Sequence, residues 1–369
     1  MESFKVIISG GGTGGHIFPA LAIANEIKEK NPLSVILFVG AKGRMEMEKI
    51  PNAGYEIIGL DVVGIQRSFS LNAILKNIKF PFLLLKSLRK AKKILKDFKP
   101  DVVIGVGGYA SGPTLRMANS LKIPTLIQEQ NSYAGLTNKW LSKKAEKICV
   151  AYEKMDRFFD VNKIIKTGNP VRKDIIDLST KKEEAVTYFK LDQKEKVILV
   201  LGGSLGARSI NNGILKSLDI IKNSPFRLLW QVGNRFIESV NSSFDKKLFS
   251  NVKTMSFIKR MDLAYAAADI VISRAGALSI SEITLIGKPS ILIPSPNVSE
   301  DHQTKNAMSL VNNNAAKLIF DNETDKVLSE AIKLLENPEE LNMIAENVKK
   351  LAKPNATEDI VKEVFKFIK

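Results

Sequence analysis

Two glycine-rich segments of the same kind stand about half the chain apart, GGGTGGH at residues 10–16 and GGSLGA at residues 202–207. Each follows an apolar run typical of a strand and precedes a helical pattern. Glycine lets backbone N–H groups come close to a ligand, and the start of a helix adds a partial positive charge. Each segment therefore suits phosphate groups or sugar hydroxyls, and the pair predicts two nucleotide-binding-type domains that face one another.

The first segment has the spacing of a dinucleotide fingerprint, with glycines at Gly10, Gly12 and Gly15. A nicotinamide or flavin site of this kind also needs an acidic residue for the ribose about 20 residues further on. The second predicted strand instead ends in FVGAKG at residues 38–43, without Asp or Glu. Neither glycine-rich segment ends in the Gly-Lys-Ser/Thr of a P-loop. The sequence thus excludes both of these nucleotide-binding classes.

His16 follows Gly15 at the start of the first predicted helix, and Pro19 fits the first turn of that helix. We expect its imidazole to point into the cleft above the sheet. A histidine can act as a general base near neutral pH. The alternative is a structural role, as a hydrogen-bonding group or a helix cap, and the sequence leaves both interpretations open.

The second half of the chain offers two further groups for a nucleotide. Ser204 places a hydroxyl beside the N–H groups of its glycine-rich segment, which suits a diphosphate, although a tight strand-to-helix turn would look the same. The segment SRAGALSISE at residues 273–282 is again a strand, a glycine turn and a helix. It places Glu282 within the first two helical turns, where a carboxylate can accept two hydrogen bonds from a ribose diol or balance the helix dipole.

Apolar, β-branched runs alternate with helix-period segments along the whole chain, which is the pattern of βαβ units around parallel sheets. We expect strands at residues 4–9, 33–39, 55–60, 101–106, 124–128, 146–151, 196–201, 226–232, 252–257, 269–273, 290–294 and 316–320. The turn TGNPVR at residues 167–172 separates the two series. We predict an α/β protein with two Rossmann-like domains, 1–166 and 167–349, and a helix at 350–369 that returns to the first domain.

The net charge of +16 is unevenly placed, because residues 1–166 carry 26 Lys and Arg against 14 Asp and Glu. Residues 67–99 alone hold ten basic residues and one acidic residue, Asp97. Apolar residues recur there at helical spacing among lysines and arginines: Leu71, Ile74, Leu75, Ile78, Phe82 and Leu85. This composition predicts a helix that lies on an anionic membrane surface, with a core-facing stripe and a solvated basic face as the alternative. Aliphatic rather than aromatic neighbours argue against a nucleic-acid partner.

Other features of the composition concern the compartment. The single cysteine, Cys149, stands in a strand-like run and is expected to be a buried hydrophobe in a reducing, cytosolic setting. The first residues enter a predicted strand without the basic start and apolar core of a secretory signal. No uncharged apolar run approaches the roughly 20 residues that span a bilayer, and the candidate at residues 80–85 is far shorter. We expect a protein that is neither exported nor membrane-spanning.

Seven motifs, in chain order, resemble those of the MurG family of bacterial N-acetylglucosaminyltransferases, which convert lipid I to lipid II in peptidoglycan synthesis. They are GGGTGGH with the following IFPA, GGYAS at 107–111, QEQN at 128–131, GNPVR at 168–172, GGSLGA, RAGA at 274–277 and DHQ at 301–303. The resemblance implies the GT-B fold, in which two Rossmann-like domains are separated by a deep cleft and the C-terminal domain holds most of the donor.

The resemblance also implies roles for individual residues. Four residues would lie near the donor sugar, namely Thr13, Gly14, Gly15 and Asn131, and two would bind the nucleotide-sugar, Arg172 and Ser204. Ile258 lies where the family's backbone contacts uracil, and Gln303 would bind the N-acetylglucosamine. The diphosphate and ribose would be framed by Ala277, Leu278, Ser279 and Glu282. Tyr109 and His16 would face the acceptor.

The implied reaction is attack by the C4 hydroxyl of the lipid-linked muramoyl sugar on the anomeric carbon of UDP-N-acetylglucosamine, with inversion. His16 is the candidate base, with Glu129 or a water relay as alternatives. Because no Asp-x-Asp pair is present, we expect neither a metal nor another cofactor, and loop N–H groups would stabilise the leaving UDP.

The implied partners are UDP-N-acetylglucosamine, lipid I, an anionic membrane surface on the cytoplasmic face of the cell membrane, and cell-wall and division proteins. The rival interpretation is a GT-B transferase for another lipid acceptor, such as diacylglycerol.

Overall fold

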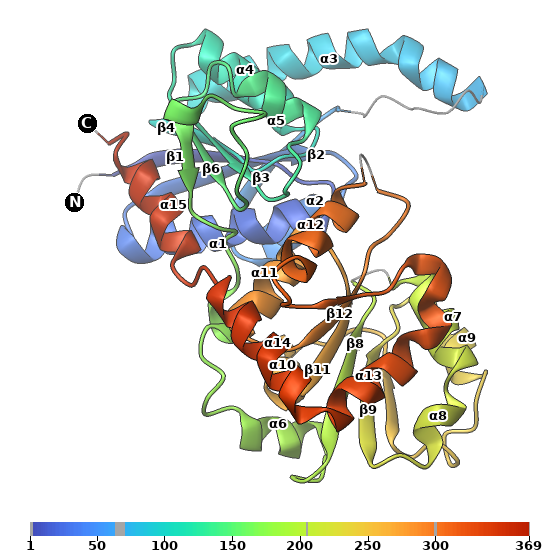
Figure 1. Ribbon diagram of the computed structural model, residues 1–369. Coiled ribbons are helices and arrows are strands. Elements are labelled where there is room, and N and C mark those ends of the chain that lie inside the picture. Colours follow the sequence, from blue (N-terminus) through green and yellow to red (C-terminus); the bar gives the residue numbers. More distant parts are fainter. Residues whose placement is uncertain (1–2, 63–70, 204–205, 299–300, 369) are drawn as a thin grey trace. The chain divides into compact units, whose positions relative to one another are not determined.

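The computed structural model describes residues 3–62, 71–203, 206–298 and 301–368, and of residues 71–79 only the backbone. The chain forms two compact units (Figure 1). The N-terminal unit comprises Met1–Val171 and Asn355–Lys369, and the C-terminal unit comprises Arg172–Pro354. The chain therefore passes between the units twice, after Val171 and after Pro354.

A parallel sheet forms the centre of the N-terminal unit, and in the described residues its seven strands have the order β3-β2-β1-β4-β5-β6-β7. The strands are β1 Lys5–Ser9, β2 Val35–Ala41, β3 Glu56–Leu60, β4 Val102–Gly105, β5 Thr125–Glu129, β6 Lys147–Val150 and β7 Ile164–Lys166. The helices are α1 Gly14–Lys30, α2 Glu46–Asn52, α3 Leu71–Phe98, α4 Ser111–Ser120, α5 Leu136–Leu141 and α15 Ala356–Phe365. Because the strand order reverses between β1 and β4, the loops after these two strands border the crevice where such sheets bind ligands.

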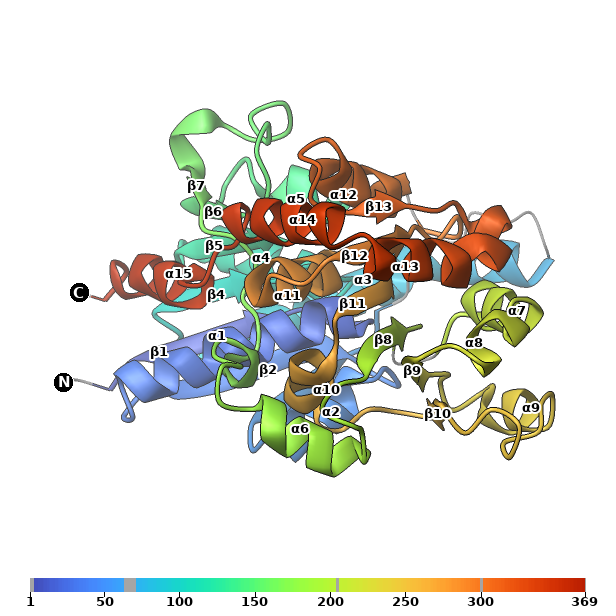
Figure 2. The same ribbon diagram turned by 60° about the horizontal axis from the view of Figure 1, so that its bottom comes forward.

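Helices cover both faces of this sheet. Alternate residues of β1 point to opposite faces, so that Val6 and Ile8 pack with α1 and α15 while Ile7 packs with α3 and α4. Helix α15 lies beside α1 in both views (Figures 1 and 2), and the rings of Phe4 and Phe365 are 6.0 Å apart. The last helix of the chain thus contributes to the core of the N-terminal unit.

The C-terminal unit contains a second parallel sheet, whose six described strands have the order β10-β9-β8-β11-β12-β13. They are β8 Lys196–Leu201, β9 Phe226–Gln231, β10 Val252–Met255, β11 Ile270–Arg274, β12 Ser290–Ile293 and β13 Lys317–Leu318. Its helices are α6 Lys182–Phe189, α7 Arg208–Lys216, α8 Asp219–Lys222, α9 Ile237–Asn241, α10 Met261–Ala267, α11 Ala277–Ile286, α12 His302–Val311, α13 Val327–Glu336 and α14 Pro338–Lys350. The strand order reverses between β8 and β11, so the second glycine-rich segment stands at the equivalent crevice.

The predicted α/β architecture of two parallel, Rossmann-like sheets is confirmed. Each of the twelve predicted strands is present, and the structure adds β7, which the sequence analysis missed. Only three residues long, β7 is recognisable through its pairing with β6, in which Ile164 lies opposite Ile148. A strand this short has no periodicity of its own, so its partner defines it.

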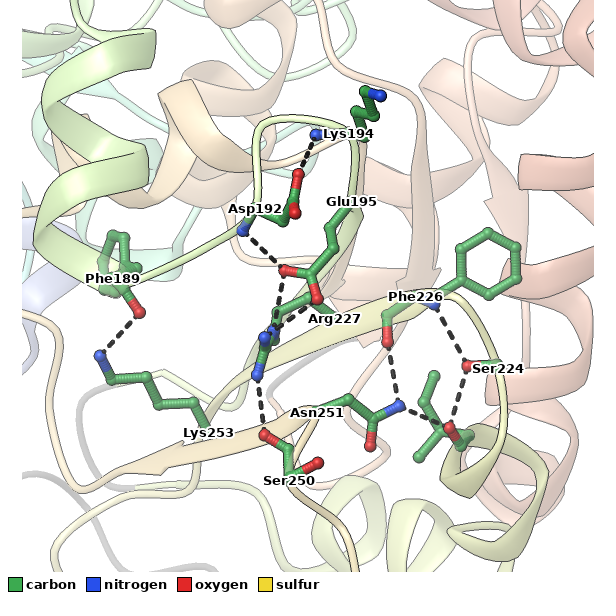
Figure 3. Close-up of polar contacts among 11 residues, drawn as sticks. Phe189, Asp192, Lys194, Glu195, Ser224, Phe226, Arg227, Ser250, Asn251 and Lys253 are labelled. Carbon is green, nitrogen blue, oxygen red and sulfur yellow. Dashed lines mark hydrogen bonds and ion pairs between the residues drawn. The ribbon is translucent and has the colours of Figure 1, made fainter.

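The amino ends of β8, β9 and β10 are joined by polar contacts (Figure 3). The Glu195 carboxylate accepts from Nε and Nη2 of Arg227 at 3.2 and 3.0 Å. Nδ2 of Asn251 donates to the carbonyls of Ile221 and Phe226 at 2.6 and 3.1 Å. These contacts lie at the edge of the sheet opposite the glycine-rich loop, so they hold the strands in register away from the candidate site.

Two further predictions concern Cys149 and membrane-spanning helices. Cys149 is buried in β6, and burial raises its pKa to about 12, so the side chain is a thiol at neutral pH. The prediction that Cys149 is buried is confirmed. Among the described helices, none is both long and apolar enough to cross a membrane.

Candidate active site

The first glycine-rich loop connects β1 to α1 and touches the loop that follows β4. The amide of Gly11 donates to the carbonyl of Gly107 at 3.3 Å. Thr13 is the N-cap of α1 with an extended backbone, and its carbonyl accepts from the amides of His16 and Ile17 at 3.1 and 3.2 Å. The helix therefore begins within the glycine-rich segment, with Gly14 and Gly15 in its first turn.

A buried carboxylate that the sequence analysis missed fills this loop. Glu46 is 1% exposed, and its two oxygens accept from the amides of Gly12 at 2.8 Å and Ala41 at 3.0 Å. A Cβ atom at Gly11, which has φ +144°, would lie 2.3 Å from the Glu46 carboxyl carbon, so only glycine leaves room for it. The Gly12 amide thus already binds an internal anion, which argues against a phosphate site at this loop.

His16 is held by the same loop. Its Nδ1 lies 2.9 Å from the carbonyl oxygen of Gly11, and its ring is half-buried against Gly107, where a Cβ atom would lie 2.8 Å from Nε2. A carbonyl oxygen only accepts, so Nδ1 carries the proton and the lone pair of the neutral ring is on Nε2. This hydrogen bond fits the structural role considered above, and it also fixes the position of Nε2.

Glu129, the alternative base, lies at the carboxyl end of β5 and is 2% exposed. One of its oxygens accepts from the backbone amide of Asn131 at 3.0 Å, and the other accepts from the Gly135 amide at 3.1 Å and from Nδ2 of Asn138 at 2.8 Å. Both oxygens therefore shape the loop after β5 and orient Asn131. This arrangement favours a positioning role for Glu129 and leaves His16 as the stronger candidate base.

Tyr109 completes the group of site residues in the N-terminal unit. It precedes α4 in the loop after β4, and its side chain is 55% exposed. The loops after β1, β4 and β5 follow adjacent strands, so the structure brings Tyr109 to the same edge of the sheet as Thr13, His16 and Asn131. The residues of this unit predicted to face the acceptor, Tyr109 and His16, thus share one edge with Thr13 and Asn131, which are predicted to lie near the donor sugar.

The remaining predicted residues belong to the C-terminal unit, at the carboxyl edge of its sheet. Ser204 lies outside the described residues. Ile258 follows β10 and is buried, and Gln303 is in the first turn of α12, where its Oε1 accepts from the Ser295 amide at 2.8 Å. Each lies beyond the carboxyl end of a strand, as a ligand site of this fold requires.

The start of α11 is suited to a diphosphate. Gly276 is the N-cap, and within the described part of the chain no side chain caps this helix end. The first amides of a helix have no intrahelical partner, so those of Ala277, Leu278 and Ser279 can donate to an anion. The predicted role of these three residues therefore matches their place in the helix.

Arg172 and Glu282, distant in sequence, form an ion pair in which Nε and Oε1 are 3.1 Å apart. The hydroxyl of Tyr265, in α10, donates to Oε2 of Glu282 at 2.8 Å. Burial raises the pKa of Glu282 above its ordinary value, and Arg172 and Tyr265 oppose that shift. The carboxylate predicted to bind ribose is therefore held on both oxygens by neighbouring side chains.

Gln231, a second residue that the sequence analysis missed, ties two loops of the C-terminal unit together. Its Nε2 donates to the carbonyl of Gly203 at 2.9 Å, and its Oε1 accepts from the amide of Ile258 at 3.1 Å. The segment predicted to hold the diphosphate is thereby joined to the residue predicted to contact uracil. A polar residue at the end of the apolar strand FRLLWQ was the signal that could have found it.

Arg274, in the RAGA motif, has a structural role. Its guanidinium donates to Oδ1 of Asp321 at 2.5 Å and to the hydroxyl of Ser209 at 2.7 Å. Asp321 begins the 3-10 helix η4, Asp321–Lys326, and Ser209 lies in α7. Arg274 therefore joins the ends of three elements around the crevice.

Two family models match most of this chain, and curated relatives match its full length. The model described as glycosyltransferase family 28 N-terminal domain matches residues 6–150, and that of the C-terminal domain matches residues 197–364. A relative from Flavobacterium psychrophilum is 54% identical, covering 100% of this chain and 99% of its own length; one from Parabacteroides distasonis is 52% identical with the same coverage. Both are named UDP-N-acetylglucosamine–N-acetylmuramyl-(pentapeptide) pyrophosphoryl-undecaprenol N-acetylglucosamine transferase.

Solved structures agree with the sequence relatives. The crystal structure of MurG from Acinetobacter baumannii is 29% identical with a TM-score of 0.76, covering 98% of this chain and 99% of its own. A UDP-GlcNAc 2-epimerase from Neisseria meningitidis shares the fold at 19% identity, with a TM-score of 0.68 and coverage of 99% of this chain and 100% of its own. This chain therefore belongs to the MurG family of N-acetylglucosamine transferases, within glycosyltransferase family 28, and has the GT-B fold.

Proposed function

We propose that this chain transfers N-acetylglucosamine from UDP-N-acetylglucosamine to lipid I, giving lipid II for peptidoglycan synthesis. The observation that carries the proposal is the 54% identity, over the full length, to a relative named for this transfer. In the proposed reaction the C4 hydroxyl of the muramoyl sugar attacks the anomeric carbon and UDP leaves, so the configuration inverts.

In this proposal the C-terminal unit binds the donor, and the N-terminal unit supplies the base and contacts the acceptor. In the C-terminal unit, the α11 amides bind the diphosphate, Glu282 accepts from the ribose hydroxyls, and Gln303 contacts the sugar. In the N-terminal unit, Nε2 of His16 takes the proton of the attacking hydroxyl, and Tyr109 contacts the acceptor. Backbone dipoles fixed before the reaction stabilise the charge that develops on UDP.

The test is transfer of radiolabel from UDP-N-acetylglucosamine to a lipid I analogue by the purified protein. We expect a labelled lipid product whose new linkage is β. Label transferred to diacylglycerol and not to the lipid I analogue would support the rival acceptor instead.

Activity is expected to persist in EDTA. The proposal assigns the leaving diphosphate to backbone amides at the start of α11, and these need no divalent ion. The measurement is the initial rate of transfer with and without chelator, using protein treated with chelator and then desalted. Abolished activity that Mg²⁺ or Mn²⁺ restores would contradict this prediction.

We further propose that α3 docks on the cytoplasmic face of the cell membrane, where the acceptor is anchored. Phe82 is 76% exposed and Leu85 is 53% exposed on this helix. Lys86 and Lys90 lie close by, although they also contact Asp61 at 3.1 Å and the carbonyl of Gly59 at 2.7 Å. Exposed apolar side chains beside cations are typical of a helix at a lipid surface.

Replacing both Phe82 and Leu85 by serine is expected to weaken binding to anionic vesicles about tenfold, because two apolar side chains no longer enter the interface. Vesicle co-sedimentation measures the affinity, and activity on a short-chain, soluble lipid I analogue should persist. The matched control replaces Leu33 and Leu248, which are 59% and 54% exposed, by serine. Equal loss of binding in both double variants would count against a specific role for α3.

A further inference from the structure

We propose that Tyr265 is a positioning residue that sets the Glu282 carboxylate for the ribose diol and makes the enzyme selective for ribonucleotide donors. This inference rests on the proposed function, in which Glu282 accepts from the ribose hydroxyls. Tyr265 belongs to none of the sequence motifs described above and stands in the mostly apolar helix MDLAYAA. Its role follows from its contact with Glu282 in the folded chain.

The acceptor positions of Glu282 match a vicinal diol. A carboxylate offers about four lone-pair positions, two on each oxygen. Nε of Arg172 occupies one on Oε1 at 3.1 Å, and the Tyr265 hydroxyl occupies one on Oε2 at 2.8 Å. Each oxygen thus keeps one further position, which suits the two O–H donors of a ribose. A deoxyribose presents only one of these donors.

Tyr265 is the more rigid of the two supports. It is 1% exposed and packs in the core beneath the sheet with Leu263, Ala264 and Ile283. The Arg172 side chain is 34% exposed and has more rotatable bonds. Burial and the neighbouring Glu282 raise the pKa of Tyr265 well above its ordinary value, so the phenol stays a donor at neutral pH. The buried ring therefore fixes Oε2, and with it the plane of the carboxylate.

Removing the Tyr265 hydroxyl is expected to let Glu282 turn toward Arg172, with which it forms an ion pair. The diol then loses its alignment while the diphosphate contacts at α11 stay in place. We expect Tyr265→Phe to raise KM for UDP-N-acetylglucosamine about tenfold, the effect of one hydrogen bond to a charged group, with kcat nearly unchanged.

The decisive measurement compares two donors, UDP-N-acetylglucosamine and its 2′-deoxyuridine counterpart, as the ratio of their kcat/KM values. We expect the wild-type enzyme to prefer the ribonucleotide by about tenfold or more, and Tyr265→Phe to lose most of that preference. The control is Tyr55→Phe, whose hydroxyl donates to Oδ1 of Asn25 at 2.7 Å in the N-terminal unit. It should leave the ratio unchanged.

A double-mutant cycle tests whether Tyr265 acts through Glu282. In a Glu282→Ala background, Tyr265→Phe should not raise the donor KM further. A Tyr265→Phe variant that is less stable but keeps the wild-type donor ratio would overturn the inference. So would a wild-type enzyme that uses both donors equally, and labelled lipid II in the same assay would then show that the proposed transfer itself stands.

Discussion

Alanine at position 16 is expected to lower kcat by about 10²- to 10⁴-fold, the usual contribution of a general base. The expectation rests on the 2.9 Å contact between Nδ1 of His16 and the Gly11 carbonyl, which leaves the basic lone pair on Nε2. KM for UDP-N-acetylglucosamine should change little, because the donor contacts are assigned to the C-terminal unit. Initial rates at saturating donor and acceptor measure the effect.

Asparagine at the same position separates the two roles of His16. An asparagine amide can donate to the Gly11 carbonyl in place of Nδ1, yet it cannot take up a proton at neutral pH. We expect His16→Asn to fold like the wild type and to be as inactive as His16→Ala. Recovery of wild-type kcat in His16→Asn would show that the histidine is structural and would return the role of base to Glu129 or to water.

Replacing Glu46 by alanine is expected to give the second large effect. The buried amide of Ala41 then loses its acceptor, at a cost of about 1–3 kcal/mol, and the amide of Gly12, an exposed residue, loses the contact that fixes the loop. The Gly11 carbonyl that holds His16 belongs to the same loop. We therefore expect a lower free energy of unfolding and a fall in kcat of about 10- to 100-fold, because a misplaced base loses its alignment.

The matched control is Glu48→Ala, in the same helix, where the carboxylate is 71% exposed and, among the described residues, pairs only with the exposed Lys49. Urea unfolding and initial rates should both stay close to wild type. Glu46→Gln adds a graded test, since one of its two terminal atoms can still accept. A Glu46→Ala enzyme with wild-type kcat would show that the loop keeps its shape without the carboxylate.

Much of the fold could be predicted because its signals are local. Apolar runs such as KVILVL at residues 196–201 are buried on both faces in parallel sheets, and their alternation with helical segments indicated both sheets. Glycines after β1 and β8 marked the carboxyl edges, where sheets of this kind bind ligands. The three-residue β7 escaped because its pairing with β6, and not its composition, makes it a strand.

The roles within the site were less accessible from the sequence. Glu129 was a candidate base by its motif, yet its two oxygens hold the amides of Asn131 and Gly135 and the side chain of Asn138. Gln231 was one polar residue among many until the structure placed it between the Gly203 carbonyl and the Ile258 amide. Such roles depend on which backbone groups a loop leaves within reach.

The sequence by itself determined two parallel α/β domains, the glycine-rich loops at their ligand-binding edges, the place of His16 at the start of a helix, and the family. Only the tertiary structure decided that Glu46 fills the first loop, that Nδ1 of His16 meets the Gly11 carbonyl, and that Tyr265 and Arg172 hold Glu282. The physical reason is separation along the chain. Gly12 and Glu46 are 34 residues apart, and Arg172 and Glu282 are 110 apart. Contacts over such distances form only once the strand order has brought the loops together, and no local pattern records them.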